Sequence, residues 1–490
     1  MKVDYQVGII GAGFAGLVAA LRLKKEGKNS FVIFERASEP GGTWRDNTYP
    51  GCACDVPSHL YSIADELNPD WSYSFSTQPE IWAYMKHVVA KHQLDRHIRY
   101  ESDIVELTFM QDLGLWRVVD KNGNLTNVKL VIAATGPLNR PNKPHFKGLE
   151  TFAGKVFHTA EWDHSYDLKG KKVGVVGTGA SAIQVIPSIA PMVSHLTVFQ
   201  RTAPWVTPRR DRRITSIEKR IFKTLPFLQK LHREGIYWSR ELFGLAFMGN
   251  DRLNRFGQRM ALRMIDKQVK DAELRKKLRP NFKLGCKRVL VADNYYETYN
   301  RANVSLVTEG LDHFTTTGIV TKDGKEYPLD AVILSTGFVA ADIELYTTIK
   351  GLDGRNLIEE WRQKGAEAFH GITVSGYPNL AFLLGPNTGL GHNSVIHMME
   401  SQMNYIIDYL KLLESKGSSN AYLNVDEVRQ KQHNNDLQEK LKHTVWASGC
   451  SSWYLNAQGK NTTLYPGLTV SYRKETRKVN PEDYHVVIPK

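Results

Sequence analysis

The chain carries the glycine pattern of a dinucleotide-binding turn twice. Residues 11–16 read Gly-x-Gly-x-x-Gly, and residues 177–182 read Gly-x-Gly-x-x-Ala. Each turn follows a short apolar run that suits a strand buried on both faces, and each precedes a stretch with helical spacing. Such a unit brings backbone N–H groups close to a pyrophosphate at a helix N-terminus. Because both turns have this context, the sequence predicts an α/β protein with two Rossmann-like, nucleotide-binding domains.

The predicted strands also give a domain organisation. A chain of 490 residues is too long for one compact core, so two or three domains are expected. Two strands that end in Thr-Gly, at 135–136 and 336–337, indicate where the chain passes between the nucleotide-binding domains. We expect the first domain at 1–140 and 340–490, the second at 141–208 and 284–339, and a mostly helical insertion into the second at 209–283.

Positive charge is concentrated in the predicted insertion. The formal net charge of the chain is +13, and residues 209–288 hold 23 Lys and Arg against 8 Asp and Glu. A local positive field can steer an anionic ligand such as a phosphorylated cofactor, and a solvated helical surface is an equal alternative. No motif supports nucleic-acid binding.

The insertion also interleaves aromatic and aliphatic residues with Lys and Arg, over 221–228 and 236–247. This pattern allows contact with a membrane surface, but packing over the second nucleotide-binding domain is the favoured interpretation. No apolar run reaches the ~18–20 residues of a membrane span. The first predicted strand begins too early to leave room for a signal peptide. A cytoplasmic protein is therefore expected.

The four cysteines do not make a disulfide framework in a chain of this size. Cys52 and Cys54 are separated by one residue, whereas the redox pairs of disulfide reductases usually have two or four residues between them. We expect these two cysteines to serve packing, and no metal site is predicted.

The residue at the end of the second strand of each unit distinguishes the two nucleotides. Glu35 stands 24 positions after Gly11, and its carboxylate can accept hydrogen bonds from a ribose diol while repelling a 2′-phosphate. The same spacing from Gly177 reaches Arg201, whose guanidinium can pair with a 2′-phosphate through two hydrogen bonds. The first site therefore suits FAD or NAD, and the second site is expected to prefer NADPH to NADH.

Two further motifs resemble the fingerprints of Baeyer–Villiger monooxygenases, flavoenzymes that insert one oxygen atom of O2 beside a ketone carbonyl. Residues 152–163 read Phe-x-Gly-x3-His-x3-Trp-Asp, and residues 41–55 read Gly-Gly-Thr-Trp-x4-Tyr-Pro-Gly-x3-Asp. Related N- and S-oxygenating flavin monooxygenases usually have Tyr or Phe where this chain has Trp162-Asp163. That pair favours the Baeyer–Villiger group, and the resemblance covers nearly the whole chain.

The resemblance implies an oxidoreductase that uses FAD, NADPH and O2 to convert a small-molecule ketone into an ester or lactone through a C4a-peroxyflavin. An N- or S-oxygenating monooxygenase is one alternative, and a non-catalytic FAD- and NADPH-binding redox sensor is another. Residues 385–389 depart from the pattern of the best-known cyclic-ketone enzymes, so linear, cyclic and aryl ketones stay open. The assembly is expected to be a monomer or a homodimer.

The resemblance also assigns catalytic residues. The family's active-site arginine lies in a basic pair before a Tyr-Tyr segment, which here is Lys287-Arg288 before Tyr295-Tyr296. Arg288 is expected to reach over the flavin, Asp55 to pair with it, and Lys287 to help hold the 2′-phosphate. One fixed guanidinium can stabilise negative charge on the attacking oxygen and on the tetrahedral adduct, because arginine stays protonated.

Two conspicuous side chains have other expected roles. His158 in the central motif is expected to be a hinge contact between the domains or a packed histidine, rather than a general base. Trp453 matches a tryptophan that contacts the nicotinamide-side ribose in the closed state of relatives.

The expected cofactor contacts follow from the two turns and the resemblance. For FAD they are Gly11, Gly13, Phe14, Ala15, Gly16, Glu35, Arg36, Gly42, Thr43, Trp44, Asp55, Tyr61 and Val105. For NADPH they are Gly177, Thr178, Gly179, Ala180, Ser181, Ala182, Gln184, Arg201, Thr202, Lys287, Arg288 and Trp453.

Overall fold

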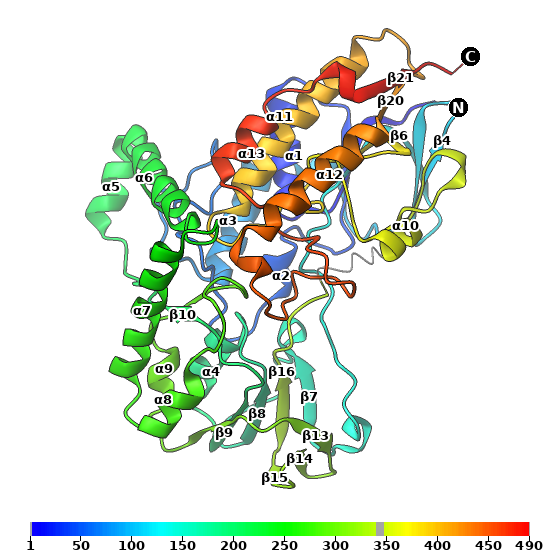
Figure 1. Ribbon diagram of the computed structural model, residues 1–490. Helices are drawn as coiled ribbons and strands as arrows, with labels where there is room; N and C mark the ends of the chain where they lie inside the picture. Colours follow the sequence, from blue (N-terminus) through cyan, green and yellow to red (C-terminus); the bar gives the residue numbers. More distant parts are fainter. Residues whose placement is uncertain (1, 340–346, 490) are drawn as a thin grey trace.

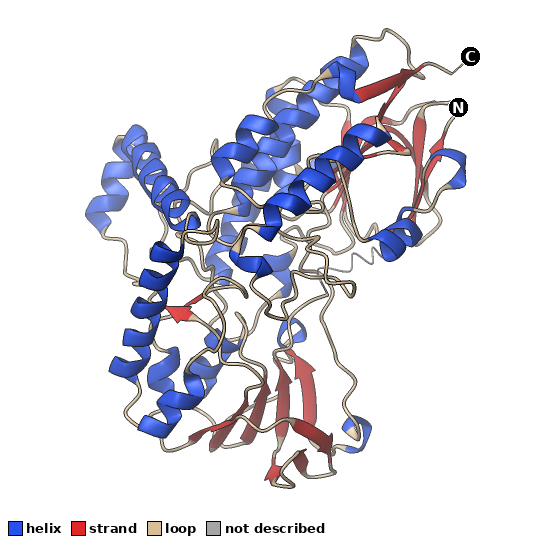
Figure 2. Cartoon of the chain, in the orientation of Figure 1, coloured by secondary structure: helices blue, strands red, loops and turns tan. Residues whose placement is uncertain are grey.

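The computed structural model describes residues 2–339 and 347–489, which form two lobes with a row of helices along one side (Figure 1). In the view of Figure 1 the upper lobe contains both termini and the larger sheet, and the lower lobe contains a smaller sheet. The strands lie mainly in the two lobes, whereas the row at the side is helical (Figure 2). Within the described residues, no helix combines the length and apolarity needed to cross a membrane.

The upper lobe is built on a nine-stranded mixed sheet of order β17-β4-β5-β6-β1-β2-β3, with β19 also paired to β6 and β18 paired to β19. The inner strand β1 runs parallel to β2 and β6, and its residues 7–10 are all buried. The strands are β1 (Tyr5–Ile10), β2 (Phe31–Phe34), β3 (Ile98–Arg99), β4 (Ile104–Met110), β5 (Leu115–Asp120), β6 (Leu125–Ala133), β17 (Thr348–Lys350), β18 (Thr373–Val374) and β19 (Tyr377–Phe382).

Helices and one hairpin complete the upper lobe. Helix α11 begins at a Ser394 cap and is mostly buried, because its apolar residues recur on the faces that pack against α1 and α13. The elements are α1 (Phe14–Lys25), α2 (Thr43–Asp46), α3 (Gln78–Lys91), α10 (Leu357–Lys364), α11 (Val395–Glu414), α12 (Glu427–Lys442), α13 (Thr469–Glu475) and the antiparallel pair β20 (Tyr422–Val425) and β21 (Tyr484–Val487).

The lower lobe is built on a five-stranded parallel sheet of order β12-β9-β8-β16-β7. Its elements are β7 (Lys155–His158), β8 (Lys172–Val176), α4 (Ala182–Ile189), β9 (His195–Phe199), α9 (Tyr295–Thr298), β12 (Val304–Val307) and β16 (Ala331–Leu334), with an antiparallel sheet of β13 (Leu311–Phe314), β14 (Gly318–Thr321) and β15 (Glu326–Pro328). Each glycine turn follows an inner parallel strand, β1 or β8. The prediction of two Rossmann-like units is therefore confirmed.

The chain crosses between the lobes at two adjacent segments. Asn142 N donates a hydrogen bond to Gly337 O at 2.8 Å, and the Thr336 hydroxyl donates to Asn142 O. These segments follow β6 and β16, the two strands that the sequence predicts before the crossings. Because the two crossing segments are hydrogen-bonded to each other, the points at which the chain leaves the two sheets lie side by side.

The helical insertion is also confirmed. It consists of α5 (Ser216–Thr224), α6 (Pro226–Gly244), α7 (Asp251–Gln268) and α8 (Ala272–Leu278), between the short paired strands β10 (Val206–Thr207) and β11 (Leu290–Val291). Helix α5 begins with a capping box between Thr215 and Glu218. Helices α5 and α6 pack together at the upper left of Figure 1, and α7 and α8 descend along the lower lobe.

Candidate active site

The first glycine turn has a shape that only glycine permits. Gly11 has a φ of +105°, and a Cβ added there would lie 2.7 Å from Ala134 O. A Cβ on Gly16 would lie 1.9 Å from Gly11 O, so the start of α1 could not approach β1. At Gly13 the nearest atom to an added Cβ is the Gly42 Cα at 3.8 Å. This side of the turn can therefore accept a pyrophosphate against the backbone.

Glu35 is held at the end of β2 beside this turn and is 4% exposed. Its carboxylate accepts hydrogen bonds from Ala12 N at 2.8 Å and Ala37 N at 3.0 Å, and it pairs with Arg45 at 2.9 Å. A carboxylate has about four acceptor positions, so one remains for a ribose hydroxyl. The position fits the ribose of an adenine dinucleotide.

The second turn repeats this geometry in the lower lobe. Gly177 has a φ of +107°, and a Cβ there would lie 2.5 Å from Ser335 O. An added Cβ at Gly179 would meet no heavy atom within 4 Å, which again permits a phosphate against the backbone. Ala182 replaces the third glycine and is buried at the start of α4. Thr178 donates to Thr202 O at 3.1 Å and so ties the turn to the segment that follows β9.

Two cations gather beside the second turn. Arg201, just after β9, is exposed, and Lys287 is half-buried. Burial lowers the pKa of Lys287, and the positive charge of Arg201 lowers it further. Like charges that destabilise one another in this way are relieved by an anion between them. The pair fits a 2′-phosphate.

Arg288 and Asp55 form an ion pair between the lobes. Arg288 Nε and Nη2 both donate to Asp55 Oδ2, at 3.1 and 2.6 Å. Burial would raise the pKa of Asp55, but the charge and hydrogen bonds of Arg288 hold it below its usual value. The charge of Asp55 in turn raises the pKa of Arg288. The guanidinium therefore stays protonated, and its orientation is fixed by the carboxylate.

The loop that carries Asp55 is locked onto α4. The Gln184 side-chain oxygen accepts from the Tyr49 hydroxyl at 3.0 Å and from Ala53 N at 3.3 Å, and Gln184 Nε2 donates to Ala53 O at 2.9 Å. A Cβ on Gly51 would lie 2.2 Å from Ser188 Oγ. Gln184, which the sequence predicts as a cofactor contact, here uses its amide to position the loop.

Two side chains near this pair were not predicted from the sequence. Tyr454 is 2% exposed; burial raises its pKa to about 12, with the charge of Arg288 opposing the shift. Arg240 comes from α6; burial lowers its pKa, and the charge of Asp55 opposes that change. Tyr454 follows Trp453 directly, which is a weak signal, whereas nothing distinguishes Arg240 from other cations of the insertion.

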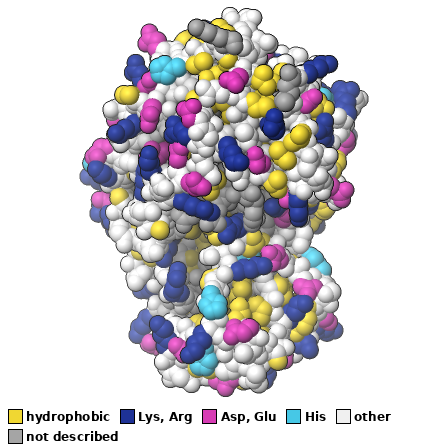
Figure 3. Space-filling model, turned by 90° about the vertical axis from the view of Figure 1, so that its right-hand side faces the viewer, with side chains coloured by type: hydrophobic (Ala, Val, Ile, Leu, Met, Phe, Trp, Pro, Cys, Tyr) yellow, Lys and Arg dark blue, Asp and Glu magenta, His cyan; other side chains and the backbone are white. Residues whose placement is uncertain are grey.

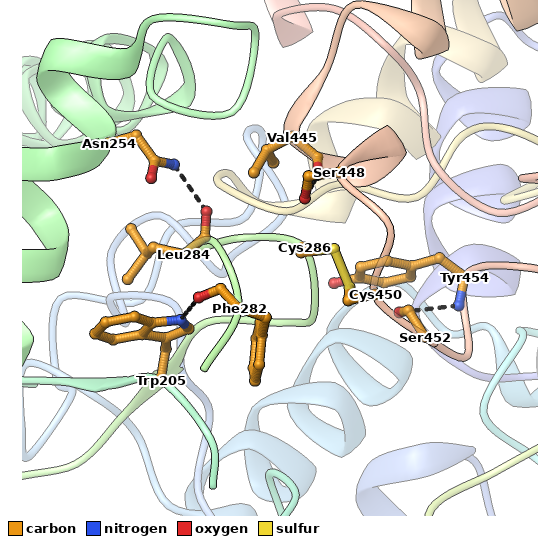
Figure 4. Close-up of a disulfide and its surroundings, with 10 residues drawn as sticks. All are labelled: Trp205, Asn254, Phe282, Leu284, Cys286, Val445, Ser448, Cys450, Ser452 and Tyr454. Carbon is orange, nitrogen blue, oxygen red and sulfur yellow. Dashed lines mark hydrogen bonds between the residues drawn. A yellow bond between two sulfur atoms is a disulfide. The ribbon is translucent and has the colours of Figure 1, made fainter. Parts of the chain in front are cut away.

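A disulfide joins Cys286 to Cys450 (Figure 4), although the sequence predicted no disulfide framework. It ties the residue before Lys287 to the segment that leads to Tyr454. The peptide before Cys286 is also fixed, because Trp205 donates to Phe282 O and Asn254 donates to Leu284 O, both at 2.8 Å. The pairing joins positions 164 residues apart, a separation that gives no local pattern. Cys52 and Cys54 are free and buried, which agrees with packing.

The central motif lies at the end of β7. His158 is 1% exposed, its Nδ1 accepts from Ala160 N at 3.1 Å, and burial lowers its pKa. Trp162 packs edge-on against Phe157, with ring centroids 5.0 Å apart. Asp163 forms an ion pair with Lys155 at 2.7 Å. These contacts shape the exit from β7, and whether His158 acts as a hinge stays a prediction.

The next residue links the lobes, because His164 Nε2 lies 2.7 Å from the Thr48 hydroxyl. Thr48 belongs to the loop between α2 and Asp55. The two resembling motifs therefore meet in space.

The remaining predicted cofactor contacts differ in their surroundings. Trp44 donates to the Tyr61 hydroxyl at 3.1 Å, and the ring of Phe14 lies 5.1 Å from that of Tyr61, so these three form one cluster beside the first turn. By contrast Val105 is 37% exposed on β4, and Trp453 is 40% exposed. Ala15 and Gly16 lie in the first turn of α1, Gly42 and Thr43 at the start of α2, Ala180 and Ser181 just before α4, and Arg36 on the surface after Glu35.

The face drawn in Figure 3 is hollowed at mid-height, between the two lobes. The two nucleotide turns and the Arg288–Asp55 pair lie on segments that approach this boundary from opposite lobes. The first turn suits a flavin nucleotide and the second a phosphorylated nicotinamide nucleotide, and the Arg288–Asp55 ion pair joins the two lobes.

Known proteins are similar to this chain in sequence. Residues 8–234 match the family described as pyridine nucleotide-disulphide oxidoreductase. A Baeyer–Villiger monooxygenase of Pseudomonas aeruginosa is 46% identical over 483 residues, which cover 98% of this chain and 91% of the relative. The chain belongs to the Baeyer–Villiger monooxygenase family. The prediction from the two motifs is thus confirmed.

Solved structures agree along the whole chain. A cyclohexanone monooxygenase from Rhodococcus sp. Phi1 bound to NADP+ has a TM-score of 0.88 at 28% identity, with 99% of each chain covered. A structure of OTEMO in complex with FAD and NADP also has a TM-score of 0.88, at 27% identity, covering 99% of this chain and 100% of that one. The protein therefore has the fold of these monooxygenases.

Proposed function

We propose that the protein is an FAD-containing, NADPH- and O2-dependent monooxygenase that converts ketones into esters or lactones. The observation that carries this proposal is the Arg288–Asp55 pair, which holds a permanently charged guanidinium where segments of the two lobes meet. Family membership and the titles of the related structures, which name FAD and NADP, support the same cofactors. The fit of both glycine turns to a pyrophosphate supports them independently.

The bound cofactors supply the redox chemistry: hydride from NADPH and activation of O2 on the flavin. The protein supplies orientation and charge. Arg288 stabilises negative charge on the oxygen that attacks the carbonyl and on the adduct that follows, and Asp55 holds the guanidinium in place. Removing a preorganised charge of this kind typically costs about 3 kcal/mol or more of barrier height.

The second site selects the phosphorylated nicotinamide nucleotide. Arg201 and Lys287 are the residues that hold the 2′-phosphate, and Glu35 makes the first site unsuited to one. We assign residues 1–140 and 340–490 to the FAD-binding domain and 141–208 and 284–339 to the NADP-binding domain, with the insertion at 209–283. The separate sheets of the two lobes support this division. A cytoplasmic location and a monomeric or homodimeric assembly stay predictions.

A product assay tests the function. Full-length protein is mixed with FAD, NADPH and air and with linear, cyclic and aryl ketones plus one sulfide, and the products are identified by mass spectrometry. An ester or lactone one oxygen atom heavier than its ketone is the expected product. Arg288→Ala is expected to lose it while the protein still binds FAD.

The two alternatives give other outcomes in the same assay. Oxidation of the sulfide without any ester points to an N- or S-oxygenating enzyme, and failure of NADPH to reduce the flavin points to a redox sensor. The comparisons favour neither alternative.

A further inference from the structure

Helix α6 is amphipathic, but its polar face is turned toward the protein and its apolar face toward the outside, the opposite of a helix that packs on an apolar core. Its inward face carries Gln229, Arg233, Tyr237 and Glu241, all buried. Its outward face carries Phe227, Leu231, Trp238 and Leu242, which are 57, 62, 55 and 63% exposed. The spacing of four, seven and four residues places these four on one side of the helix. We call these four residues the α6 apolar face.

Polar contacts fix this orientation. Gln229 Nε2 donates to Asn68 O at 2.7 Å and lies 3.1 Å from His59 Nδ1. Glu241 accepts from Asn393 Nδ2 at 2.6 Å and from Val470 N at 3.1 Å. A rotation that buried the apolar face would leave these buried polar groups without partners, which is costly. The apolar face is therefore held toward the outside.

The exposure is concentrated in this part of the chain. Among the described residues, half of the large apolar side chains that are exposed fall within residues 217–256. Helix α5, packed beside α6, adds Ile217, which is 70% exposed, and Leu225 between the two helices is 44% exposed. A contiguous patch of exposed apolar side chains marks a site of interaction with another protein or with a membrane. The sequence alone favoured packing of this segment over the second nucleotide-binding domain, and the exposed side chains change that interpretation.

Charge selects the partner. Lys230 on α6 and Arg220 on α5 are exposed and form no ion pair in the described parts of the chain, and the same holds for Arg252, Arg255 and Arg259 on α7. A second copy of the chain would bring this strongly basic surface against itself. An anionic lipid surface offers opposite charge at the headgroups and apolar depth beneath them.

We propose that the α6 apolar face docks on an anionic lipid bilayer. The four apolar side chains enter the boundary between headgroups and acyl chains, while Lys230 and Arg220 pair with the headgroup phosphates. Because α6 also carries Arg240 into the field of Asp55, docking places the bilayer on the outer side of the helix that borders the catalytic pair.

Vesicle co-sedimentation tests this proposal. Full-length protein is mixed with vesicles of phosphatidylcholine alone or of phosphatidylcholine with phosphatidylglycerol. We expect binding to the anionic vesicles, weaker binding at high salt, and a partition coefficient reduced by roughly tenfold or more in Leu231→Ser/Trp238→Ser. Arg220→Gln/Lys230→Gln is expected to weaken binding to the anionic vesicles only.

The matched control is Val428→Ser/Ile488→Ser, which removes two exposed apolar side chains, 74 and 53% exposed, outside the insertion. It is expected to bind vesicles like the unmodified protein. Trp238 itself gives a second readout, as the difference in fluorescence between the protein and Trp238→Phe, and its emission is expected to shift to shorter wavelength on anionic vesicles.

Three results would overturn the proposal: no binding to anionic vesicles, equal binding of Leu231→Ser/Trp238→Ser, or a dimer in light scattering that this variant dissociates. The last would make the face an interface between two copies. The docking variants leave both nucleotide turns and the Arg288–Asp55 pair intact, so NADPH oxidation reports separately on the proposed activity.

Discussion

Arg288 and Asp55 meet through two hydrogen bonds that end on the same carboxylate oxygen, Asp55 Oδ2. One partner comes from the loop that Gln184 locks onto α4, and the other follows a disulfide-linked cysteine. Both ends of the pair are thus anchored independently, which is what a preorganised charge requires.

The first prediction concerns Asp55→Asn. This substitution keeps the size of the side chain and removes its charge, so Arg288 loses its orientation but stays in the site. Loss of a charged hydrogen bond corresponds to about tenfold to hundredfold in product formation. We expect NADPH oxidation to continue with H2O2 as its main product, measured as ester formed per NADPH consumed. The control Asp70→Asn breaks an exposed pair with Lys223 and should leave that ratio unchanged; an unchanged ratio in Asp55→Asn would rule out the positioning role.

The nucleotide turns could be predicted from the sequence because their requirements are local. A φ above +100° at Gly11 and Gly177, and a helix start that touches the turn, demand glycine at fixed spacing. The end of the second strand lies at a constant distance along the chain, which gives Glu35 and Arg201. Arg288 and Asp55 came from the family resemblance, since no local spacing connects residues 233 positions apart.

What the sequence missed depends on contacts between distant segments. The Cys286–Cys450 bond, the burial of Tyr454 and the approach of Arg240 to Asp55 all arise from packing of the insertion and the C-terminal segment against the boundary of the lobes. The outward orientation of the apolar face of α6 could not be predicted for a related reason. Its periodicity predicts an amphipathic helix, but only the polar partners of Gln229 and Glu241 decide which face turns inward.

The second prediction concerns nucleotide selectivity. Arg201→Ala is expected to raise the KM for NADPH by about tenfold to hundredfold, because it removes a charged hydrogen bond to the 2′-phosphate, while the KM for NADH changes little. Steady-state kinetics with both nucleotides gives the ratio. Arg252→Ala removes an exposed cation of the insertion and serves as the control for general charge. A parallel rise in both KM values would show that Arg201 acts on the fold and not on the phosphate.

The third prediction concerns the disulfide. Cys450→Ser should release the segment that carries Trp453 and Tyr454 from the residue before Lys287, and so raise the KM for NADPH. A bond that closes so long a loop contributes about 2–4 kcal/mol to the free energy of unfolding. Alkylation with and without a reductant, read by mass spectrometry, identifies the bonded pair, and thermal unfolding measures the loss of stability.

Dithiothreitol should reproduce the effects of Cys450→Ser on the unmodified protein and add nothing to the variant. Four alkylated cysteines in denatured protein that was never reduced would exclude the bond. The two free cysteines, Cys52 and Cys54, are expected to react only after unfolding, because burial raises the pKa of Cys52 to about 12.

The last prediction concerns Glu241, which joins α6 to the upper lobe. Burial would raise its pKa, but hydrogen bonds from His392, Thr469, Asn393 and Val470 N lower it from 4.5 to about 2. A carboxyl whose pKa is lower in the folded state stabilises the fold above its unfolded pKa, and this contribution is lost as the pH falls through the folded value. The difference corresponds to about 3 kcal/mol at neutral pH.

Glu241→Gln should therefore lower the free energy of unfolding most at neutral pH, and the gap to the unmodified protein should narrow as the pH falls from 4.5 toward 2. Denaturant unfolding over a pH series measures the gap. Glu273→Gln alters an exposed pair on α8 and should give a small gap that hardly depends on pH. A gap for Glu241→Gln that is equally large below pH 4.5 would mean that shape, and not the charge of this buried carboxylate, holds α6 with its apolar face outward.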